Sequence, residues 1–489
     1  MSRHSLFRLD KNATGSLQHQ IREILVKAIL DNHLPGDSAL PSCRKLAKQL
    51  GVGRNTVVIA YQTLVDDGYL ISKERSGHYV NTALSQTSLS NQKHHEHSET
   101  AGWINSIKFK PSELPHLHKP VNWRDFPYPF VYGQFDPTLF PIADWRECVR
   151  ESVAISAIHE WAGDRFDRDD PRLTHQIKTR LLPRRGIWVD DDQILITSGT
   201  QQAICLISQL LTDSNSVIGM EEPGYFDARN VLGLNKPKFM PLEIDKSGIK
   251  INDDLNQCDL IYTTPSHHYP TTVTMPLKRR QLLLKKAAEH NIIILEDDYE
   301  TENNFFSTQP IPSLKSLDKQ GNVLYMGSLS KTLAPGLRMG YLVGPAKLIK
   351  EARAYRRLMM RHMPANNQQI IALFIKRGHY DSLVHKMHNE FKSRWKLMDA
   401  ALHKHLANHV RYFSSGGTSF WIQGPKWLDA DRLQKQAAGN GLLIESGSVF
   451  FMHPPKHNNH FVLGYSSISK EKIEPGIKKL GEVIQSLEA

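Results

Sequence analysis

Residues 327–341 have the sequence GSLSKTLAPGLRMGY, which places small hydroxyl side chains, a lysine and an arginine within one short turn. The amine of Lys331 can form an imine with an aldehyde, while the Ser328 hydroxyl and the Arg338 guanidinium can hold a phosphate. These are the chemical needs of pyridoxal phosphate. Taken singly, the same residues also suit an exposed lysine and arginine beside a Pro-Gly turn.

Upstream of this turn, short apolar segments alternate with helix-like segments, which is the order of a parallel sheet. Small or polar residues follow each apolar segment. The predicted strands are 193–197, 216–220, 260–263, 292–297 and 322–326. Because ligands bind beyond the carboxyl ends of the strands in an open α/β sheet, we expect these ends to form one pocket.

The residues at these strand ends suit the same cofactor. Residues 198–200, Ser-Gly-Thr, open a helix whose N–H groups and dipole favour a phosphate. Asp297 can pair with a pyridinium nitrogen, Tyr299 can donate to a phenolic oxygen, and Tyr225 can stack on a ring. Taken singly, the first motif also suits an ordinary capped helix, Asp297 a helix cap and Tyr225 a core aromatic.

The first eighty residues have the pattern of three helices and a hairpin. Apolar spacing predicts a helix over 16–31 with Ser16 as its N-cap, then a short helix capped by Ser42. A third helix should begin near Arg54, and residues 69–80 alternate as a hairpin of wing type. The third helix presents polar residues at its start that can meet DNA, although a small three-helix cap with solvated basic ends is the alternative.

Residues 82–122 are polar and aperiodic, so we expect a flexible linker between a domain at 12–81 and a domain at 123–489. The linker contains His94-His95-Glu96-His97, but a short polar tract without a scaffold is usually solvated, and we expect no metal site. Beyond it, a helix is predicted over 143–157.

Composition sets broad limits on the function. The chain has 489 residues and 40% hydrophobic content, enough for two or more domains. Its net charge of +11 and pI near 9.3 permit a polyanionic partner without requiring one. The four cysteines lack C-x-x-C spacing, so we expect neither disulfides nor zinc, and a reducing cytoplasm. No run of about eighteen apolar residues occurs, so we expect no membrane span.

The N-terminal motifs at 34–36, 40–47 and 52–57 resemble the winged helix-turn-helix of GntR-type bacterial regulators. The resemblance implies that arginines at the starts of the second and third helices contact DNA, and that the wing glycine lets backbone approach the minor groove. Gly53 departs from the family, which often has Ser or Thr there as a cap. The DNA-binding residues would be Arg44, Arg54, Asn55, Thr56, Ser76, Gly77 and His78.

The remainder, about 123–489, resembles the fold-type I aminotransferases. The resemblance rests on motifs at 198–202, 222–225, 264–270, 296–299 and 327–340, which occur in the family's order. It implies an α/β fold with a mainly parallel sheet, a smaller C-terminal α+β subdomain and a homodimer. Lys331 would be the catalytic Schiff-base lysine. The cofactor-binding set would be Ser198, Gly199, Thr200, Tyr225, Asp297, Tyr299, Ser328, Lys331 and Arg338.

The order of the two domains resembles the MocR subfamily of GntR-type regulators. This resemblance implies a transcription regulator that binds promoter DNA and senses pyridoxal phosphate, or an amine or amino acid that reacts with it. An aminotransferase that carries a DNA-binding module is the alternative, and a regulator whose large domain no longer holds cofactor is a third.

Three departures bear on turnover. His268 stands where the aminotransferase pattern has Gln, and Thr272 where it has Gly. In the strand at 460–465, Val462 stands where the family often has the arginine that binds the substrate α-carboxylate. Loss of that charge-assisted contact costs about 1.5–3 kcal/mol, so we expect poor discrimination in favour of α-amino acids. Arg229 or an arginine of the partner subunit is the alternative source of this contact.

Overall fold

The computed structural model describes residues 9, 15–74, 76–83, 103–300, 311–407, 410–414, 416–455 and 458–488. It divides the chain into two compact units, Met1–Lys110 and Pro111–Ala489. The predicted histidine cluster at 94–97 lies outside the described residues. No helix of the described part has the length and apolar character needed to cross a membrane.

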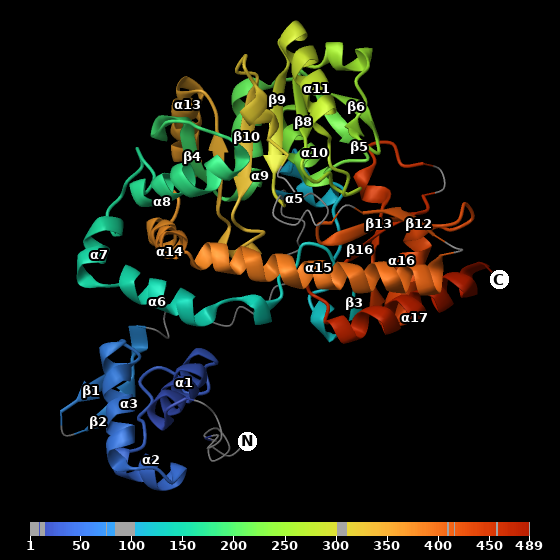
Figure 1. The fold of residues 1–489 in the computed structure, drawn as a ribbon. Coiled ribbons are helices and arrows are strands. Elements are labelled where there is room, and N and C mark those ends of the chain that lie inside the picture. The colour runs from blue at the N-terminus through green and yellow to red at the C-terminus, as the bar shows by residue number, and fades with distance from the viewer. Residues whose placement is uncertain are drawn as a thin grey trace. The chain divides into compact units, whose positions relative to one another are not determined.

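Within the first unit, residues 17–80 form three helices and a two-stranded antiparallel hairpin (Figure 1). Its elements are α1 (Leu17–Leu30), α2 (Cys43–Leu50), α3 (Arg54–Asp66), β1 (Leu70–Lys73) and β2 (Gly77–Val80). The helices form because apolar residues recur every three or four positions, and residues such as Ile21, Leu25, Val57, Tyr61 and Leu64 are buried together. Full burial of one such side chain contributes about 1.5–3 kcal/mol.

Side-chain caps fix where these helices begin. Ser16 Oγ accepts from the His19 N–H of α1, and Ser42 Oγ accepts from the Lys45 N–H of α2, which confirms both predicted caps. Gly53 precedes α3 and provides no side-chain cap. The predicted helix-turn-helix and wing are therefore present, with a weaker cap on the third helix.

The second unit is built around an eight-stranded sheet with the order β4-β11-β10-β9-β8-β5-β6-β7. The strands β10, β9, β8, β5 and β6 pair in parallel, while β11 is antiparallel to both β10 and β4. The strand bounds are β4 Ile194–Thr197, β5 Val217–Glu222, β6 Lys238–Asp245, β7 Gly248–Ile249, β8 Leu260–Thr263, β9 Ile293–Asp298, β10 Val323–Ser328 and β11 Gly340–Val343.

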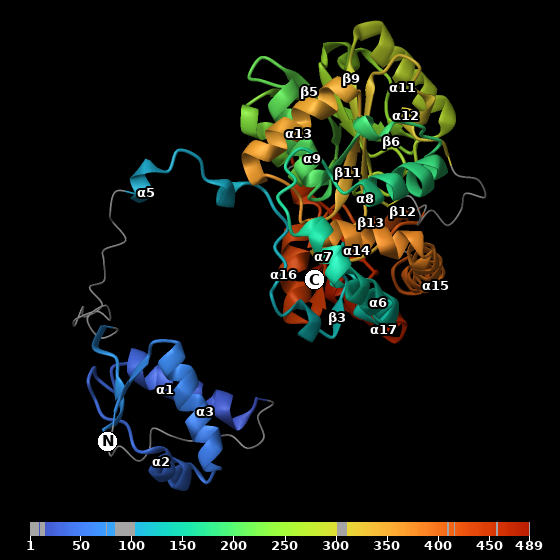
Figure 2. The same cartoon turned by 90° about the vertical axis from the view of Figure 1, so that its left-hand side faces the viewer.

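Helices cover both faces of this sheet (Figure 2). Alternate strand residues point to opposite faces, so Leu295 and Leu324 pack in one apolar cluster while Ile294 and Val323 pack in another. The helices α9 (Gly199–Leu211), α10 (Phe226–Leu232) and α13 (Ala346–Met360) contribute to the first cluster, and α11 (Leu277–His290) and α12 (Leu314–Leu317) contribute to the second.

A smaller antiparallel sheet, in the order β12-β13-β16-β15, lies in the C-terminal part. Its strands are β12 Arg411–Phe413, β13 Ser419–Gln423, β15 Glu445–Ser446 and β16 His460–Gly464, and a separate parallel pair joins β3 Tyr128–Pro129 to β14 Leu442–Leu443. The helices of this part are α15 His379–Leu406, α16 Ala430–Gly439 and α17 Lys470–Glu488 (Figure 1). The predicted α/β fold with a smaller α+β part is confirmed.

The predicted single helix over 143–157 is wrong. The structure has two helices here, α6 Ile142–Ser152 and α7 Ile155–Trp161. At the break between them, the carbonyl oxygen of Ser152 loses its helical partner. It accepts instead from Trp161 Nε1 at 2.7 Å, so it keeps a hydrogen bond. The short helix α5 Trp103–Ser106 belongs to the first unit, and the other helices of the second unit are α8 Pro171–Gln176 and α14 Ala365–Lys376.

Candidate functional site

The carboxyl ends of the central strands border one cavity of about 220 Å³. Eight of the nine predicted cofactor residues line it, and they come from four separate motifs. The ninth, Ser198, lies beside it, where its carbonyl oxygen accepts from Arg338 Nη2 at 3.2 Å. The cavity is lined by Tyr132, Gly133, Gly199, Thr200, Gln201, Tyr225, Thr264, Tyr269, Asp297, Tyr299, Ser328, Ser330, Lys331, Pro335 and Arg338.

Lys331 follows β10 and lines this cavity. Its Nζ lies 4.2 Å from the ring centroid of Tyr132 and 5.7 Å from that of Tyr299. Desolvation lowers the pKa of this amine, against the opposing fields of Glu300 and Asp297. A lowered pKa increases the neutral fraction, which is the nucleophilic form of a lysine.

Asp297 lies near the end of β9 and is almost fully buried. Its Oδ2 accepts from the Tyr262 hydroxyl at 2.7 Å, but its Oδ1 has no hydrogen-bond partner among the described residues. Burial raises the pKa of this carboxyl to about 7, although the bond from Tyr262 acts in the opposite direction. An N–H donor in the cavity would satisfy Oδ1 and favour the ionised form.

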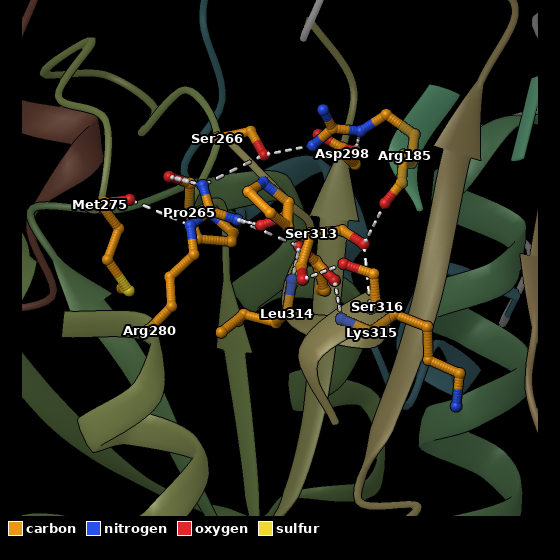
Figure 3. A network of polar contacts seen from close by, with 12 residues as sticks. Arg185, Pro265, Ser266, Met275, Arg280, Asp298, Ser313, Leu314, Lys315 and Ser316 are labelled. Atoms are coloured by element: carbon orange, nitrogen blue, oxygen red, sulfur yellow. Dashed lines mark hydrogen bonds and ion pairs between the residues drawn. The ribbon is translucent and has the colours of Figure 1, made fainter. Parts of the chain in front are cut away.

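The residues on either side of Asp297 hold β9 in place (Figure 3). Because side chains alternate along a strand, Glu296 and Asp298 point away from the face that carries Asp297. Glu296 accepts from the N–H groups of Leu314 and Lys315 at 2.8 and 2.9 Å. Asp298 forms a buried ion pair with Arg185, with Nε and Oδ2 2.6 Å apart. These contacts fix the position from which Asp297 faces the cavity.

Arg280 braces the loop that follows β8 (Figure 3). Its fully buried guanidinium donates to the carbonyl oxygens of Pro265 at 2.8 Å and Met275 at 2.9 Å. Both departures noted in this loop, His268 and Thr272, are buried between those anchors. Neither of them lines the cavity, whose wall takes Thr264 and Tyr269 from this loop.

His268 and Thr272 change the inside of the loop. His268 Nδ1 lies 2.6 Å from Thr271 Oγ1, and its Nε2 lies 3.4 Å from Glu221 Oε2. Burial lowers the pKa of His268 to about 3, so the ring is neutral at neutral pH. Thr272 has φ of 62°, a left-handed conformation that favours glycine, which explains why the aminotransferase pattern has Gly there.

One end of the cavity suits an anion. Gly199 begins α9 with φ of 73°, and a Cβ at this position would lie 3.1 Å from Arg338 Nη2. A glycine therefore allows the guanidinium to approach the first turn of the helix, whose free N–H groups also favour a phosphate. Ser328 and Ser330 line the same cavity and add hydroxyl groups.

The family's arginine position in the small sheet has no equivalent cation. Val462 is fully buried in an apolar cluster with Phe226, Tyr269 and Phe450. Arg229, the alternative source of a carboxylate contact, donates through Nη2 to the Val449 carbonyl oxygen at 2.9 Å and does not line the cavity. The cations on the cavity wall, within the part of the chain that is described, are Lys331 and Arg338.

Several lining residues were not predicted. Ser330, Pro335, Thr264 and Tyr269 belong to motifs that were recognised, so only their individual roles were missed. Tyr132 and Gly133 had no local signal, because they reach the cavity from a loop after β3. Tyr132 stacks on Tyr269 with ring centroids 4.5 Å apart.

The predicted DNA-binding residues of the first unit lie at the starts of α2 and α3 and in the hairpin. Arg44, Arg54 and Asn55 are exposed, and Thr56 is half-buried. Gly77 has φ of 110°, which a larger residue adopts only with strain. Ser76 Oγ lies 2.6 Å from the Tyr79 hydroxyl, whereas the ring of His78 packs edge-on against Tyr61. His78 is therefore directed toward the core of the unit.

Comparison with known proteins supports this division of the chain. Bacterial regulatory proteins of the gntR family match residues 17–80, and aminotransferase class I and II matches residues 147–480. The HTH-type transcriptional regulator TauR of Rhodobacter capsulatus is 38% identical over 480 residues, covering 98% of this chain and 99% of that protein. The probable rhizopine catabolism regulatory protein MocR of Rhizobium meliloti is 30% identical over 489 residues, covering 98% and 96%.

Among solved structures, the kynurenine aminotransferase of Pyrococcus horikoshii, in a complex with PMP, gives a TM-score of 0.71 at 25% identity. The match covers 79% of this chain and 98% of that one. A winged helix-turn-helix joined to an aminotransferase-like unit defines a class of transcriptional regulators. The chain belongs to the MocR subfamily of GntR-type regulators, which confirms the resemblance seen in the sequence.

Proposed function

We propose that this regulator binds promoter DNA through residues 12–81 and holds pyridoxal 5'-phosphate in the cavity of residues 123–489, with 82–122 as a linker. The observation that carries the proposal is the unpartnered Asp297 Oδ1 in the same cavity as Lys331 and Arg338. The PMP-bound structural neighbour also supports this cofactor. When bound, the group supplies an aldehyde for a lysine amine and a ring that withdraws electrons.

Each lining residue has a role toward that group in this proposal. Lys331 is the attachment residue, Asp297 holds the proton of the ring nitrogen, and Tyr225 stacks on the ring. Tyr299 donates to the phenolic oxygen. The phosphate is held by Ser198, Gly199, Thr200, Ser328 and Arg338.

In the first unit, the proposal gives direct DNA contacts to Arg44, Arg54, Asn55 and Thr56, which lie at the starts of α2 and α3. Ser76, Gly77 and His78 form the wing. The exposed basic side chains attract the phosphate backbone of DNA, and this attraction supplies much of the affinity of DNA-binding proteins.

A cytoplasmic homodimer is part of the same proposal. Leu358 and Met359 of α13 are 77% and 50% exposed, and large apolar side chains of this kind favour burial against a second copy. The four cysteines are free thiols, which suits a reducing compartment.

The second candidate function is an aminotransferase that carries a DNA-binding unit. The cavity favours it because Lys331, Asp297 and Arg338 remain together. Val462 disfavours it, because this position lies in an apolar cluster and offers no guanidinium to a substrate carboxylate. Sustained turnover of an amino donor and a keto acid by the purified protein would support the enzyme over the sensor.

The deciding experiment measures DNA affinity of the full chain with and without cofactor, together with visible absorbance. Arg54→Ala should weaken promoter binding and reduce its salt dependence while the absorbance stays intact. The exposed Lys27→Ala on α1 is a matched control that should retain affinity. The proposal would be contradicted if Arg54→Ala left the affinity for DNA unchanged. It would also be contradicted if the DNA affinity of the wild type did not depend on the cofactor.

A further inference from the structure

A buried carboxylate lies next to the position of the missing arginine. Glu445 of β15 is directly opposite Val462 of β16, which is in turn opposite Trp421 of β13. Directly opposite residues of antiparallel strands share one face of a sheet. Glu445 therefore lies on the face of the small sheet that packs on the aromatic residues of the cofactor cavity.

Only half of this carboxylate is satisfied. Glu445 is 7% exposed, and its Oε1 accepts from the Tyr132 N–H at 3.3 Å. Its Oε2 has no hydrogen-bond partner among the residues described. Tyr132 lines the cofactor cavity, so Glu445 is hydrogen-bonded to the wall of that cavity.

A second cavity, of about 480 Å³, opens on the other side of Glu445 and is also bordered by His118, Lys119 and Gln434. Burial raises the pKa of Glu445 to about 7, while the Tyr132 N–H, Lys119 and Lys331 oppose that shift. Within the described residues, no ion pair joins Glu445 to either lysine. The unpaired Oε2 of Glu445 therefore occurs beside an open cavity. A buried carboxylate with a free oxygen is stabilised by a cationic donor.

We propose that the effector is an amine with a second positive charge, a diamine or polyamine, and that Glu445 binds its distal ammonium group. The inference rests on the proposed function, since one amine of the ligand would react in the cofactor cavity while the other reaches Glu445, which is hydrogen-bonded to the cavity residue Tyr132 and borders the second cavity. Val462 removes the attraction for a carboxylate, and Glu445 replaces it with attraction for a cation. An amino acid would place its carboxylate beside another carboxylate and lose affinity.

The test uses the full chain saturated with pyridoxal phosphate and three probes of similar length. These are 1,5-diaminopentane, pentylamine and 5-aminopentanoate, titrated while absorbance, thermal unfolding and DNA affinity are recorded. The diamine should bind roughly 10- to 100-fold more tightly than pentylamine, as expected for one charge-assisted hydrogen bond. The amino acid should bind most weakly.

Glu445→Gln should abolish the preference for the diamine while the cofactor absorbance and a cooperative unfolding transition persist. Asp431→Asn is the matched control, because Asp431 is an exposed carboxylate on the wall of the same second cavity. The Asp431→Asn variant should bind the three probes in the same order of affinity as the wild type. If Glu445→Gln fails to fold, Val462→Arg provides the second test, since a guanidinium beside Glu445 should also remove the preference.

Two outcomes would overturn the inference: equal or tighter binding of 5-aminopentanoate to the wild type, or an unchanged diamine preference in a folded Glu445→Gln variant. The proposed function fails separately, when wild-type DNA affinity does not depend on pyridoxal phosphate. Cofactor-dependent DNA binding without a diamine preference would therefore remove the inference alone.

Discussion

Two regions at the cofactor cavity differ in how much they keep of the family pattern: the phosphate end, and the ligand end, by which we mean the small sheet that packs on the aromatic residues of the cavity wall. The phosphate end has Gly199, Ser328 and Arg338 in two short local motifs, and all face one cavity. At the ligand end, Val462 stands where the family often has an arginine, and Glu445 lies directly opposite it in the small antiparallel sheet. The residues suited to the cofactor are thus kept together in local motifs, while the arginine position of the small sheet is not kept.

Lys331→Ala should have the largest effect on this comparison, because Lys331 lies on the wall shared by both ends. We expect complete loss of covalent cofactor attachment and of the visible absorbance band. Borohydride reduction followed by peptide mapping measures this directly. Lys350→Ala, an exposed lysine on α13, should retain both signals, and a label on any lysine other than Lys331 would contradict the assignment.

Arg338→Ala should weaken cofactor binding at the phosphate end without changing ligand preference at the ligand end. The change removes a charge-assisted contact at the phosphate end, so cofactor affinity should fall by roughly 10- to 100-fold. The order of amine ligands at the other end should stay unchanged in the fraction that remains loaded. An absorbance titration with pyridoxal phosphate measures the affinity. Arg361→Ala, which removes an exposed ion pair with Asp164, is the control and should bind cofactor normally.

The sequence was sufficient for the fold and for the phosphate end, and physical reasons explain why it failed elsewhere. Motifs such as 198–200 and 327–340 are each local, so each can be recognised from its own residues, and the convergence of the strand ends predicts that they meet. Tyr132 and Glu445 are 313 residues apart and meet only through the tertiary fold. The break between α6 and α7 was missed because periodicity does not report the Trp161 hydrogen bond that stabilises it.

Buried carboxyl groups at both ends should make the cofactor-free protein less stable as pH rises. The pKa of Asp297 and that of Glu445 are each raised to about 7 by burial. Between pH 4 and 7 the folded state therefore holds more protons than the unfolded state, and the free energy of unfolding should fall with pH.

The measurement is denaturant unfolding of the cofactor-free chain at several pH values. Each group contributes a slope of at most about 1.4 kcal/mol per pH unit in this window. Asp297→Asn and Glu445→Gln should each reduce the slope, and the double variant should reduce it further. A single variant with the wild-type slope would show that its carboxyl group is not protonated in the folded state.

The smallest expected effect concerns Gly53, a departure from the family that should leave the cavity untouched. Gly53 occupies the N-cap of α3 with φ of −64° and ψ of 142°, which serine adopts without strain. A Cβ there would lie 3.7 Å from Thr56 Oγ1, an ordinary contact. Gly53→Ser should therefore stabilise the first unit by a few tenths of a kcal/mol, because its hydroxyl can accept a free N–H of the first turn.

Amide hydrogen exchange of α3 in the full chain measures this gain, and Gly53→Ala is the matched control. Alanine adds the same Cβ without an acceptor and is a much poorer N-cap than glycine, so it should destabilise α3. Equal protection in the serine and alanine variants would show that the cap is not the cause. Cofactor absorbance and the order of amine ligands should not change in either variant, because Gly53 belongs to the first unit and does not line the cavity.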